Sequence, residues 1–289
     1  MKKILVTGAS GNVGRFVVEE LLALGETVVA GGTKVSSLEE IFGERVTPVV
    51  LDFQNPDTFE QALAGVDRVF LMRPPHLGKA SDMYPFVDAM KGKGIRLVSF
   101  LSLMGVEKNP FPPHGKIEKY LEEAQLPYAH IRPGFFMQNL SGIHAEEIRE
   151  RGEIWVPAGK SRTSFIDARD IGRATAVVLH QWEKYQNTSH TLTGGEALDY
   201  YQVAEILTRV MGREIRYLNP GFLEYRRHYI GERKLDAGYV HVTMALYLMT
   251  RLGTAQGITE DFYRITGNSP RTLEEFAEEN RSIFLKDTE

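Results

Sequence analysis

Short runs of apolar, largely β-branched residues alternate with amphipathic segments through the first half of the chain. The apolar runs predict strands at residues 4–7, 27–30, 46–51, 66–71 and 95–101. Their nearly continuous apolar character indicates a sheet that is covered on both faces. Helical spacing is found between them, at 13–24, 58–63, 80–91 and 116–124. Strands and helices that alternate in this way predict an α/β fold with a doubly wound parallel sheet.

The alternation ends after a sixth predicted strand at 128–132, which Pro133 and Gly134 close. Short strand candidates follow at 155–157, 163–166 and 191–193, with a helix that opens at 167–170. Helical patterns then dominate, at 200–211, 221–229, 236–249 and 273–284. We therefore expect a sheet domain over residues 1–153, to which 163–182 returns, and a smaller, mostly helical lobe over the rest of 154–289.

Composition excludes several classes of function. The net charge of -4 gives no broad basic field for nucleic acid or an anionic membrane. The chain has no cysteine, and its eight histidines show no paired spacing for a metal, so we expect no metal site. The amino-terminal apolar run is too short for a signal peptide, and no apolar stretch approaches the roughly 20 residues that cross a bilayer. We expect a cytoplasmic protein without membrane or nucleic-acid partners.

A glycine-rich loop lies between the first predicted strand and the first predicted helix. Residues 3–18 read KILVTGASGNVGRFVV, with glycines at 8, 11 and 14. Glycine lets the chain leave the strand, lets the backbone approach a phosphate and lets the helix pack closely, while the helix amino-terminus favours an anion. This context predicts a Rossmann domain that binds a nicotinamide dinucleotide, the alternative being a tight turn without ligand. The predicted pyrophosphate contacts are the amides of Gly11, Asn12 and Val13 and the hydroxyl of Ser10, and the family resemblance described below implies Gly8 as well.

The choice of dinucleotide depends on the end of the second predicted strand. NAD-binding sites carry Asp or Glu there, which accepts a hydrogen bond from the ribose 2′-hydroxyl. This strand ends in Ala-Gly-Gly and then Thr33 and Lys34, without a carboxylate. Thr33 and Lys34 could bind a 2′-phosphate, although Lys34 is equally explained as a surface lysine. We expect NADP(H), with NAD(H) as the alternative.

Two further strand ends could border the same pocket. Asp52 and Phe53 follow the third predicted strand and could bracket the adenine, or Asp52 could cap a helix. Met72, Arg73 and Pro74 follow the fourth strand, at the carboxyl edge where ligands bind in such folds.

Six segments together resemble the atypical short-chain dehydrogenases, and within them the NmrA-like proteins. They are TGASGNVG (7–14), LDF (51–53), SFLSLMGV (99–106), LPYAHIRPGFFMQN (126–139), FIDARDIGRA (165–174) and PRTLEEFAEENRSIF (270–284). That family includes NADPH-dependent quinone reductases and triphenylmethane dye reductases, and the resemblance covers essentially the whole chain. It implies that the segment 72–74 lies beside the ribose and nicotinamide, and that Pro133, Gly134 and Phe135 lie beside the nicotinamide ring. Many NADP-binding relatives have an arginine where this chain has glycine and threonine, which leaves the choice of cofactor open.

The catalytic pair of ordinary short-chain dehydrogenases is missing. Those enzymes use a tyrosine followed four residues later by a lysine that lowers the tyrosine pKa. None of the twelve tyrosines here has such a lysine, so Ser102, at the usual serine position, has no tyrosine to partner. His114 falls instead where isoflavone-reductase relatives keep a catalytic lysine. Histidine titrates near neutrality and could donate a proton, although His114 could also be a polar residue that starts a helix after the Pro-Phe-Pro-Pro loop at 110–113.

We therefore expect an NAD(P)H-dependent reductase that passes hydride directly to a quinone-like or other conjugated, aromatic small molecule, with the proton from solvent or His114. Phe222, Tyr225, Tyr229 and the stretch 244–249 would form an apolar lid in the carboxy-terminal lobe, or else belong to its core. The alternative is a non-catalytic NmrA-like protein that senses the dinucleotide and regulates a partner. No motif specifies the oligomeric state.

Overall fold

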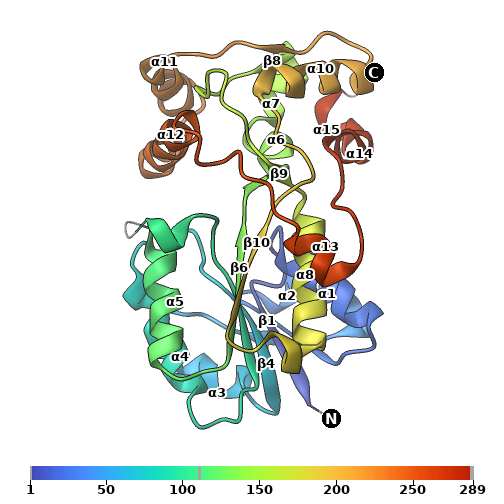
Figure 1. Cartoon of the computed structure of the whole chain (residues 1–289). Coiled ribbons are helices and arrows are strands. Elements are labelled where there is room, and N and C mark those ends of the chain that lie inside the picture. Colours follow the sequence, from blue (N-terminus) through green and yellow to red (C-terminus); the bar gives the residue numbers. More distant parts are fainter. Residues whose placement is uncertain (1, 110–111, 287–289) are drawn as a thin grey trace. The chain divides into compact units, whose positions relative to one another are not determined.

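The computed structural model describes residues 2–109 and 112–286. Contacts divide the chain into two units (Figure 1). The first comprises Met1–Pro133, Ala168–Leu192 and Glu260–Asn268, and the second comprises Gly134–Asp167, Thr193–Thr259 and Ser269–Glu289. The division falls at Pro133 and not at residue 153, because Met137, Leu140 and Ile148 pack into the core of the second unit. The returning segment likewise begins at Ala168 and not at 163.

The first unit is built on a seven-stranded sheet in the order β10-β6-β5-β4-β1-β2-β3, and every pair of neighbours is parallel. The six strands predicted in the first part of the chain are all present, each within two residues of the expected bounds. The strands are β1 (Lys3–Thr7), β2 (Val28–Gly32), β3 (Thr47–Val50), β4 (Val66–Met72), β5 (Leu97–Leu101), β6 (Tyr128–Pro133) and β10 (Thr188–Leu192). The inner strands β1, β2, β4 and β5 are almost wholly buried, so their sequences are largely apolar, whereas the edge strands β3 and β10 are partly exposed. This is the predicted α/β Rossmann architecture.

Helices cover both faces of this sheet (Figure 1). One apolar core joins the sheet to α3, α4 and α5 and includes Phe86 and Ile117. On the other face α1 packs against α8 so closely that a Cβ at Gly172 would lie 2.5 Å from Cβ of Phe16. The helices of the unit are α1 (Gly14–Ala23), α2 (Val35–Phe42), α3 (Phe59–Ala62), α4 (Tyr84–Met90), α5 (Pro113–Glu123), α8 (Ala168–His180), α9 (Trp182–Tyr185) and α13 (Asp261–Thr266). Single turns of 3-10 helix are η1 (Gly43–Arg45), η2 (Pro56–Thr58), η3 (Ala80–Met83) and η4 (Val106–Lys108).

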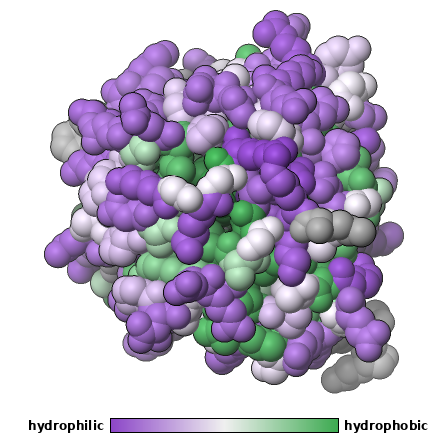
Figure 2. Space-filling view, turned by 90° about the horizontal axis from the view of Figure 1, so that it is seen from below, coloured by the Kyte–Doolittle hydropathy of each residue, from purple (hydrophilic) through white to green (hydrophobic). Residues whose placement is uncertain are grey.

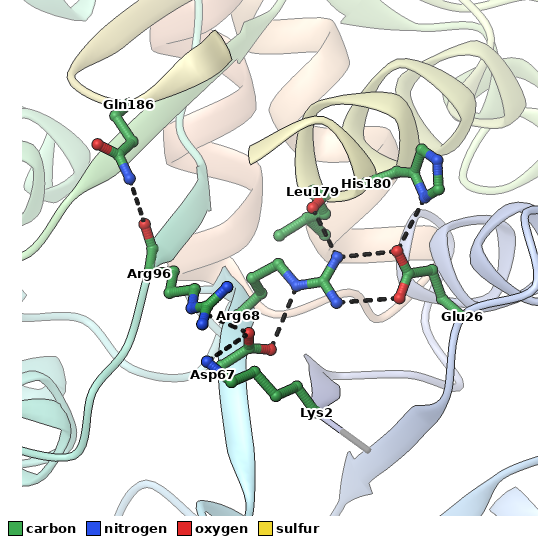
Figure 3. Close-up of polar contacts among 8 residues, drawn as sticks. All are labelled: Lys2, Glu26, Asp67, Arg68, Arg96, Leu179, His180 and Gln186. Carbon is green, nitrogen blue, oxygen red and sulfur yellow. Dashed lines mark hydrogen bonds and ion pairs between the residues drawn. The ribbon is translucent and has the colours of Figure 1, made fainter. Parts of the chain in front are cut away.

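A buried ion network lies at the amino ends of these strands, around Arg68 of β4 (Figure 3). Its guanidinium donates to both carboxylate oxygens of Glu26 at 2.8 and 2.9 Å and to the carbonyl oxygen of Leu179 at 3.0 Å. Asp67 accepts from Nε at 3.3 Å, and the Nδ1 atom of His180 lies 2.8 Å from Glu26. Burial opposes ionisation of Glu26, but the hydrogen bonds from Arg68 and His180 outweigh it and lower the pKa of this carboxyl. The network joins β4 to the loop before β2 and to the end of α8.

The second unit combines short strands with helices. Two parallel pairs join β7 (Phe135–Phe136) to β9 (Phe165–Ile166) and β8 (Glu153–Ile154) to β11 (Arg216–Tyr217). No strand forms at 155–157, because pairing with β11 places the strand two residues earlier. Its helices are α6 (Gln138–Ser141), α7 (Ala145–Arg151), α10 (Tyr200–Met211), α11 (Phe222–Arg226), α12 (Ala237–Arg251), α14 (Leu273–Glu279) and α15 (Arg281–Phe284), with a π-helix, η5 (Arg227–Glu232), directly after α11.

The core of the second unit is rich in tyrosine. Tyr225 and Tyr229 are fully buried, so they belong to this core and not to a lid. The ring of His144 lies between two hydroxyl groups, with Nδ1 2.8 Å from Tyr229 and Nε2 2.8 Å from Tyr247. Burial lowers the pKa of His144 to about 4, with the charge of Arg233 adding to the effect and that of Glu147 opposing it. Hydrogen bonds such as these offset the cost of burying polar groups in this core.

No helix in the described part of the chain is long and apolar enough to span a bilayer. Figure 2 shows the face that is seen from below in the view of Figure 1. Polar side chains dominate this face, and apolar ones gather in its centre.

Candidate functional site

The glycine loop between β1 and α1 has a geometry that requires glycine. Gly8 has φ +60°, and a Cβ there would lie 2.8 Å from Sδ of Met72. A Cβ at Gly14 would lie 2.2 Å from the carbonyl oxygen of Gly8, a distance that real Cβ atoms do not adopt. An alanine at position 14 would therefore push the loop and the helix apart. The loop holds the first turn of α1 directly against the end of β1.

This close packing leaves backbone donors free at the start of α1. The Gly11 amide donates to the Gly8 carbonyl oxygen at 2.9 Å, so it closes the turn and does not point outward. No described residue accepts a hydrogen bond from the amides of Asn12 or Val13. The first turn of α1 has no acidic residue, and Ser10 and Asn12 are exposed. A ten-residue helix that begins with free amides and no carboxylate attracts an anion such as a pyrophosphate.

Thr33 and Lys34 follow β2 as exposed residues. Lys34 is the N-cap of α2, and its side chain makes no capping hydrogen bond. The first turn of α2 has no acidic residue. A phosphate at this strand end would meet an ammonium group and a helix amino-terminus, both of which favour it, and no carboxylate from this turn.

Asp52 and Phe53 are both engaged locally. Asp52 Oδ1 accepts a hydrogen bond from the amide of Gln54 at 2.9 Å, so the carboxylate stabilises its own turn. The Phe53 ring is 8% exposed and packs edge-on against Phe86, with centroids 5.2 Å apart. The Phe53 ring, which we predicted to contact the adenine, therefore lies in the core. Only the backbone of Phe53 remains at the edge of the sheet.

Arg73 leaves the end of β4 and folds back over its own loop. Its Nη1 atom donates to the carbonyl oxygens of Pro74, at 3.2 Å, and of Leu77. Its Nε atom is buried and has no hydrogen-bond partner within the described residues. Burial lowers the pKa of Arg73, and Asp82 opposes this change. The chain thus keeps a buried cationic donor beside Met72, at the carboxyl edge of the sheet.

His114 is the second residue of α5, and its ring centroid lies 6.2 Å from that of Phe100. Pro110 and Phe111, in the loop that precedes α5, lie outside the described residues. Burial and then the charge of Arg73 lower the pKa of His114 to about 4, although Glu118 opposes them. The pKa of this half-buried imidazole thus lies below the range near neutrality that the sequence suggested. The imidazole is neutral near pH 7, and its Nδ1 atom is buried without a partner among the described side chains.

Sequence reasoning missed a row of polar side chains between α5 and the sheet. Arg132 of β6 donates to both carboxylate oxygens of Glu118, at 2.9 and 2.6 Å. His130 is fully buried, with Nε2 3.1 Å from Oε1 of Glu122. The signal was present in the sequence, because polar residues at 114, 118 and 122 share one face of a helix and those at 130 and 132 share one face of a strand.

The remaining predicted contacts are divided between the two units. Pro133 ends β6 in the first unit, and its carbonyl oxygen accepts from the amide of Met104 at 3.0 Å. Gly134 and Phe135 begin the second unit, where the Phe135 ring lies 6.3 Å from that of Tyr247. The first unit thus brings together its own predicted residues along the carboxyl ends of β1, β2, β4 and β6. The contacts of Gly134 and Phe135 with the nicotinamide stay predictions.

No three histidine, aspartate or glutamate side chains within residues 2–109 and 112–286 are grouped so as to hold a metal ion.

Sequence comparison identifies the family. A family model described as "NmrA-like family" matches residues 1–251. The chain belongs to this family. Among curated relatives, the NAD(P)H azoreductase of Xenophilus azovorans is 29% identical over 287 residues, which covers 97% of this chain and 99% of that protein.

Solved structures of similar proteins share the fold of this NmrA-like chain. A triphenylmethane reductase of Citrobacter sp., complexed with NADP(H), aligns with a TM-score of 0.85 and 21% identity over 96% of this chain and 99% of that one. An NADPH-dependent quinone oxidoreductase of Escherichia coli, complexed with NADPH, aligns with a TM-score of 0.86 and 21% identity over the same shares of the two chains.

Proposed function

We propose that this NmrA-like chain is an NAD(P)H-dependent oxidoreductase that prefers NADP(H). The observation that carries the proposal is the glycine loop, which presents the free amides of Asn12 and Val13 at the amino-terminus of α1. Two proteins of the same fold are named as complexes with this dinucleotide, and a relative is named as an NAD(P)H enzyme. When bound, the reduced nicotinamide supplies a hydride.

The chain's own residues then have distinct tasks. Asn12 and Val13 bind the pyrophosphate through their amides, with Ser10 adding a hydroxyl and Gly8 and Gly11 letting the backbone come close. Thr33 and Lys34 bind the 2′-phosphate. The segment 52–53 borders the adenine, 72–74 borders the ribose and the nicotinamide, and 133–135 borders the nicotinamide ring.

His114 acts as a neutral hydrogen-bond donor. With its pKa at about 4 it carries no extra proton at neutral pH, so it cannot serve as a ready acid there. A neutral imidazole N–H can still stabilise negative charge that develops on an acceptor's oxygen or nitrogen, and the proton itself comes from solvent. This chemistry suits acceptors that are electrophilic enough to take hydride without prior protonation.

We therefore propose conjugated acceptors such as quinones and azo or triphenylmethane dyes. The proteins named above act on acceptors of this kind, according to their names. In the second unit α12 has no Asp, Glu, Lys or Arg from residue 237 to 250. Val242, Leu246 and Leu252, on and just after this helix, are 61%, 44% and 71% exposed. Apolar residues exposed together in this way often mark a binding surface.

The test is to mix the purified protein with NADPH or NADH and a panel of a benzoquinone, an azo dye and a triphenylmethane dye. Loss of nicotinamide absorbance with at least one acceptor, faster with NADPH, is expected. Tight binding of NADPH without turnover of any acceptor would refute the enzyme and leave the dinucleotide-sensing protein. Failure to bind either dinucleotide would refute the role of the glycine loop.

A further inference from the structure

The ion pair between α5 and β6 is buried and bidentate. The side chains of Glu118 and Arg132 are only 6% and 15% exposed, and two hydrogen bonds of 2.6 and 2.9 Å join them. Hydrogen bonds from Arg132 lower the pKa of Glu118 despite its burial, so the carboxylate is charged at neutral pH. Burying two charges costs desolvation that a well-packed apolar pair would avoid. Stability alone therefore does not account for this pair, and its fixed geometry is the property to explain.

The pair sits one helical turn from His114. Glu118 is the fourth residue after His114, so both lie on the face of α5 that meets the sheet. On the sheet that this face meets, β5 and β6 are held in one register. Phe100 pairs with His130, and the amide of Ser102 donates to the Ile131 carbonyl oxygen at 2.7 Å.

Arg132 also reaches a third element. Its Nη1 atom lies 3.5 Å from Oε2 of Glu107 in η4, the turn that follows β5. One guanidinium thus links β6, α5 and η4. Because the guanidinium fork is rigid and planar, it fixes direction as well as distance.

We propose that Glu118 and Arg132 are positioning residues for His114, which hold the first turn of α5 against the carboxyl ends of β5 and β6 so that the imidazole keeps one orientation. The proposal rests on the role given to His114 in the proposed function. A donor that stabilises developing charge must be held to within a fraction of an ångström, so loss of the brace reduces turnover without removing the donor.

A double-mutant cycle tests this with the best acceptor of the panel. Glu118→Gln removes the charge, Arg132→Lys keeps the charge but loses the fork, and each is also combined with His114→Asn. We expect each single substitution to lower kcat by about tenfold or more, with the affinity for NADPH unchanged. Neither should lower it further once His114 is replaced, because the pair acts through that ring. If the loss of kcat in a combined variant equals the sum of the two single losses, in free-energy terms, the proposal is overturned.

The matched control is Glu274→Gln. Glu274 pairs with Arg209 at 2.9 Å, but both side chains are about half exposed. This variant should keep wild-type kcat. An equal loss in the control would also overturn the proposal.

A readout that does not depend on turnover separates this proposal from the proposed function. In the intact protein, nuclear Overhauser contacts between the rings of His114 and Phe100 report the orientation of the imidazole, since the centroids are 6.2 Å apart. We expect Glu118→Gln and Arg132→Lys to weaken these contacts while the rest of the amide spectrum is preserved. Unchanged contacts would overturn the positioning role even if the enzyme is active. Failure of both variants to fold would show that the pair serves the fold itself, which also overturns it.

Discussion

Replacing Glu26 by glutamine perturbs the ion network at the amino ends of the strands with almost no change in volume. In the wild type, Arg68 is 8% exposed and donates to both oxygens of Glu26. A glutamine side chain offers one acceptor oxygen and turns a donor toward the guanidinium. The variant therefore loses one charge-assisted hydrogen bond and the full negative charge.

The expected loss of stability is about 2 kcal/mol. Removing one partner of a buried ion pair costs about 3–5 kcal/mol. Arg68 keeps Asp67 at 3.3 Å and the Leu179 carbonyl at 3.0 Å, and Glu26 is itself 15% exposed, so the loss falls below that range.

Denaturant unfolding followed by the fluorescence of Trp182 measures this loss in the first unit. Trp182 belongs to that unit, where Arg96 stacks on its ring at 4.9 Å, and a Trp155→Phe background removes the other tryptophan. Glu274→Gln, from an exposed pair in the second unit, is the control and should leave this transition unchanged.

The pH dependence of this stability difference provides a second test of the reasoning. Because folding lowers the pKa of Glu26, its contribution is complete above the ordinary value of 4.5 and is lost as pH falls through the folded pKa. The difference between the wild type and Glu26→Gln should therefore shrink as pH falls below 4.5. A difference that stays constant down to acid pH, or a transition that does not move at pH 7, would refute the reasoning.

Gly14→Ala should abolish tight NADPH binding, because the added Cβ would lie 2.2 Å from the carbonyl oxygen of Gly8. Gly78→Ala is the control and should bind like the wild type, because no atom lies within 4 Å of a Cβ added there. Titration of NADPH fluorescence compares the two variants. Lys34→Glu should weaken NADPH binding at least about tenfold without weakening NADH binding, because a carboxylate repels a 2′-phosphate but can accept from a 2′-hydroxyl. Equal affinities for NADPH in variant and wild type would contradict the assignment. In the folded protein His144 has a pKa of about 4, so as pH falls the unfolded chain is protonated at this residue before the folded one. The unfolding free energy should therefore decrease by about 3 kcal/mol between pH 6.5 and pH 4 because of His144. His144→Gln should flatten that part of the pH profile of the unfolding free energy, and an unaltered profile would count against a neutral buried ring.

Local sequence signals were sufficient where a segment's neighbours in sequence complete its structure. The helix predicted over 200–211 has those bounds in the structure. Asp199 accepts from the amide of Gln202 at 2.9 Å, the Gln202 side chain accepts in return at 3.1 Å, and Gly212 ends the helix with φ +70°. All of these groups lie within a few residues of the helix, so the pattern alone specifies it.

One helix departs from the predicted pattern where its side chains contact residues far away in the sequence. The helix predicted over 221–229 changes at Arg227 into a π-helix. There His228 lies 2.7 Å from Glu147, and Tyr229 lies 2.8 Å from His144, partners more than eighty residues away. The helical period in the sequence contains no sign of those distant contacts, and π-helical turns are rare departures from an α-helix.

The sequence by itself determined the parallel sheet, the glycine loop and the absence of a Tyr-x-x-x-Lys pair, because each depends on apolar runs or on residues close together in the chain. Only the tertiary structure decided that the first segment of the first unit ends at Pro133, that Arg68 and Arg132 are buried in ion pairs, and that the pKa of His114 is lowered. These properties depend on burial and on partners that folding brings from other elements. A side chain's charge and orientation follow from such surroundings, which its neighbours in sequence do not specify.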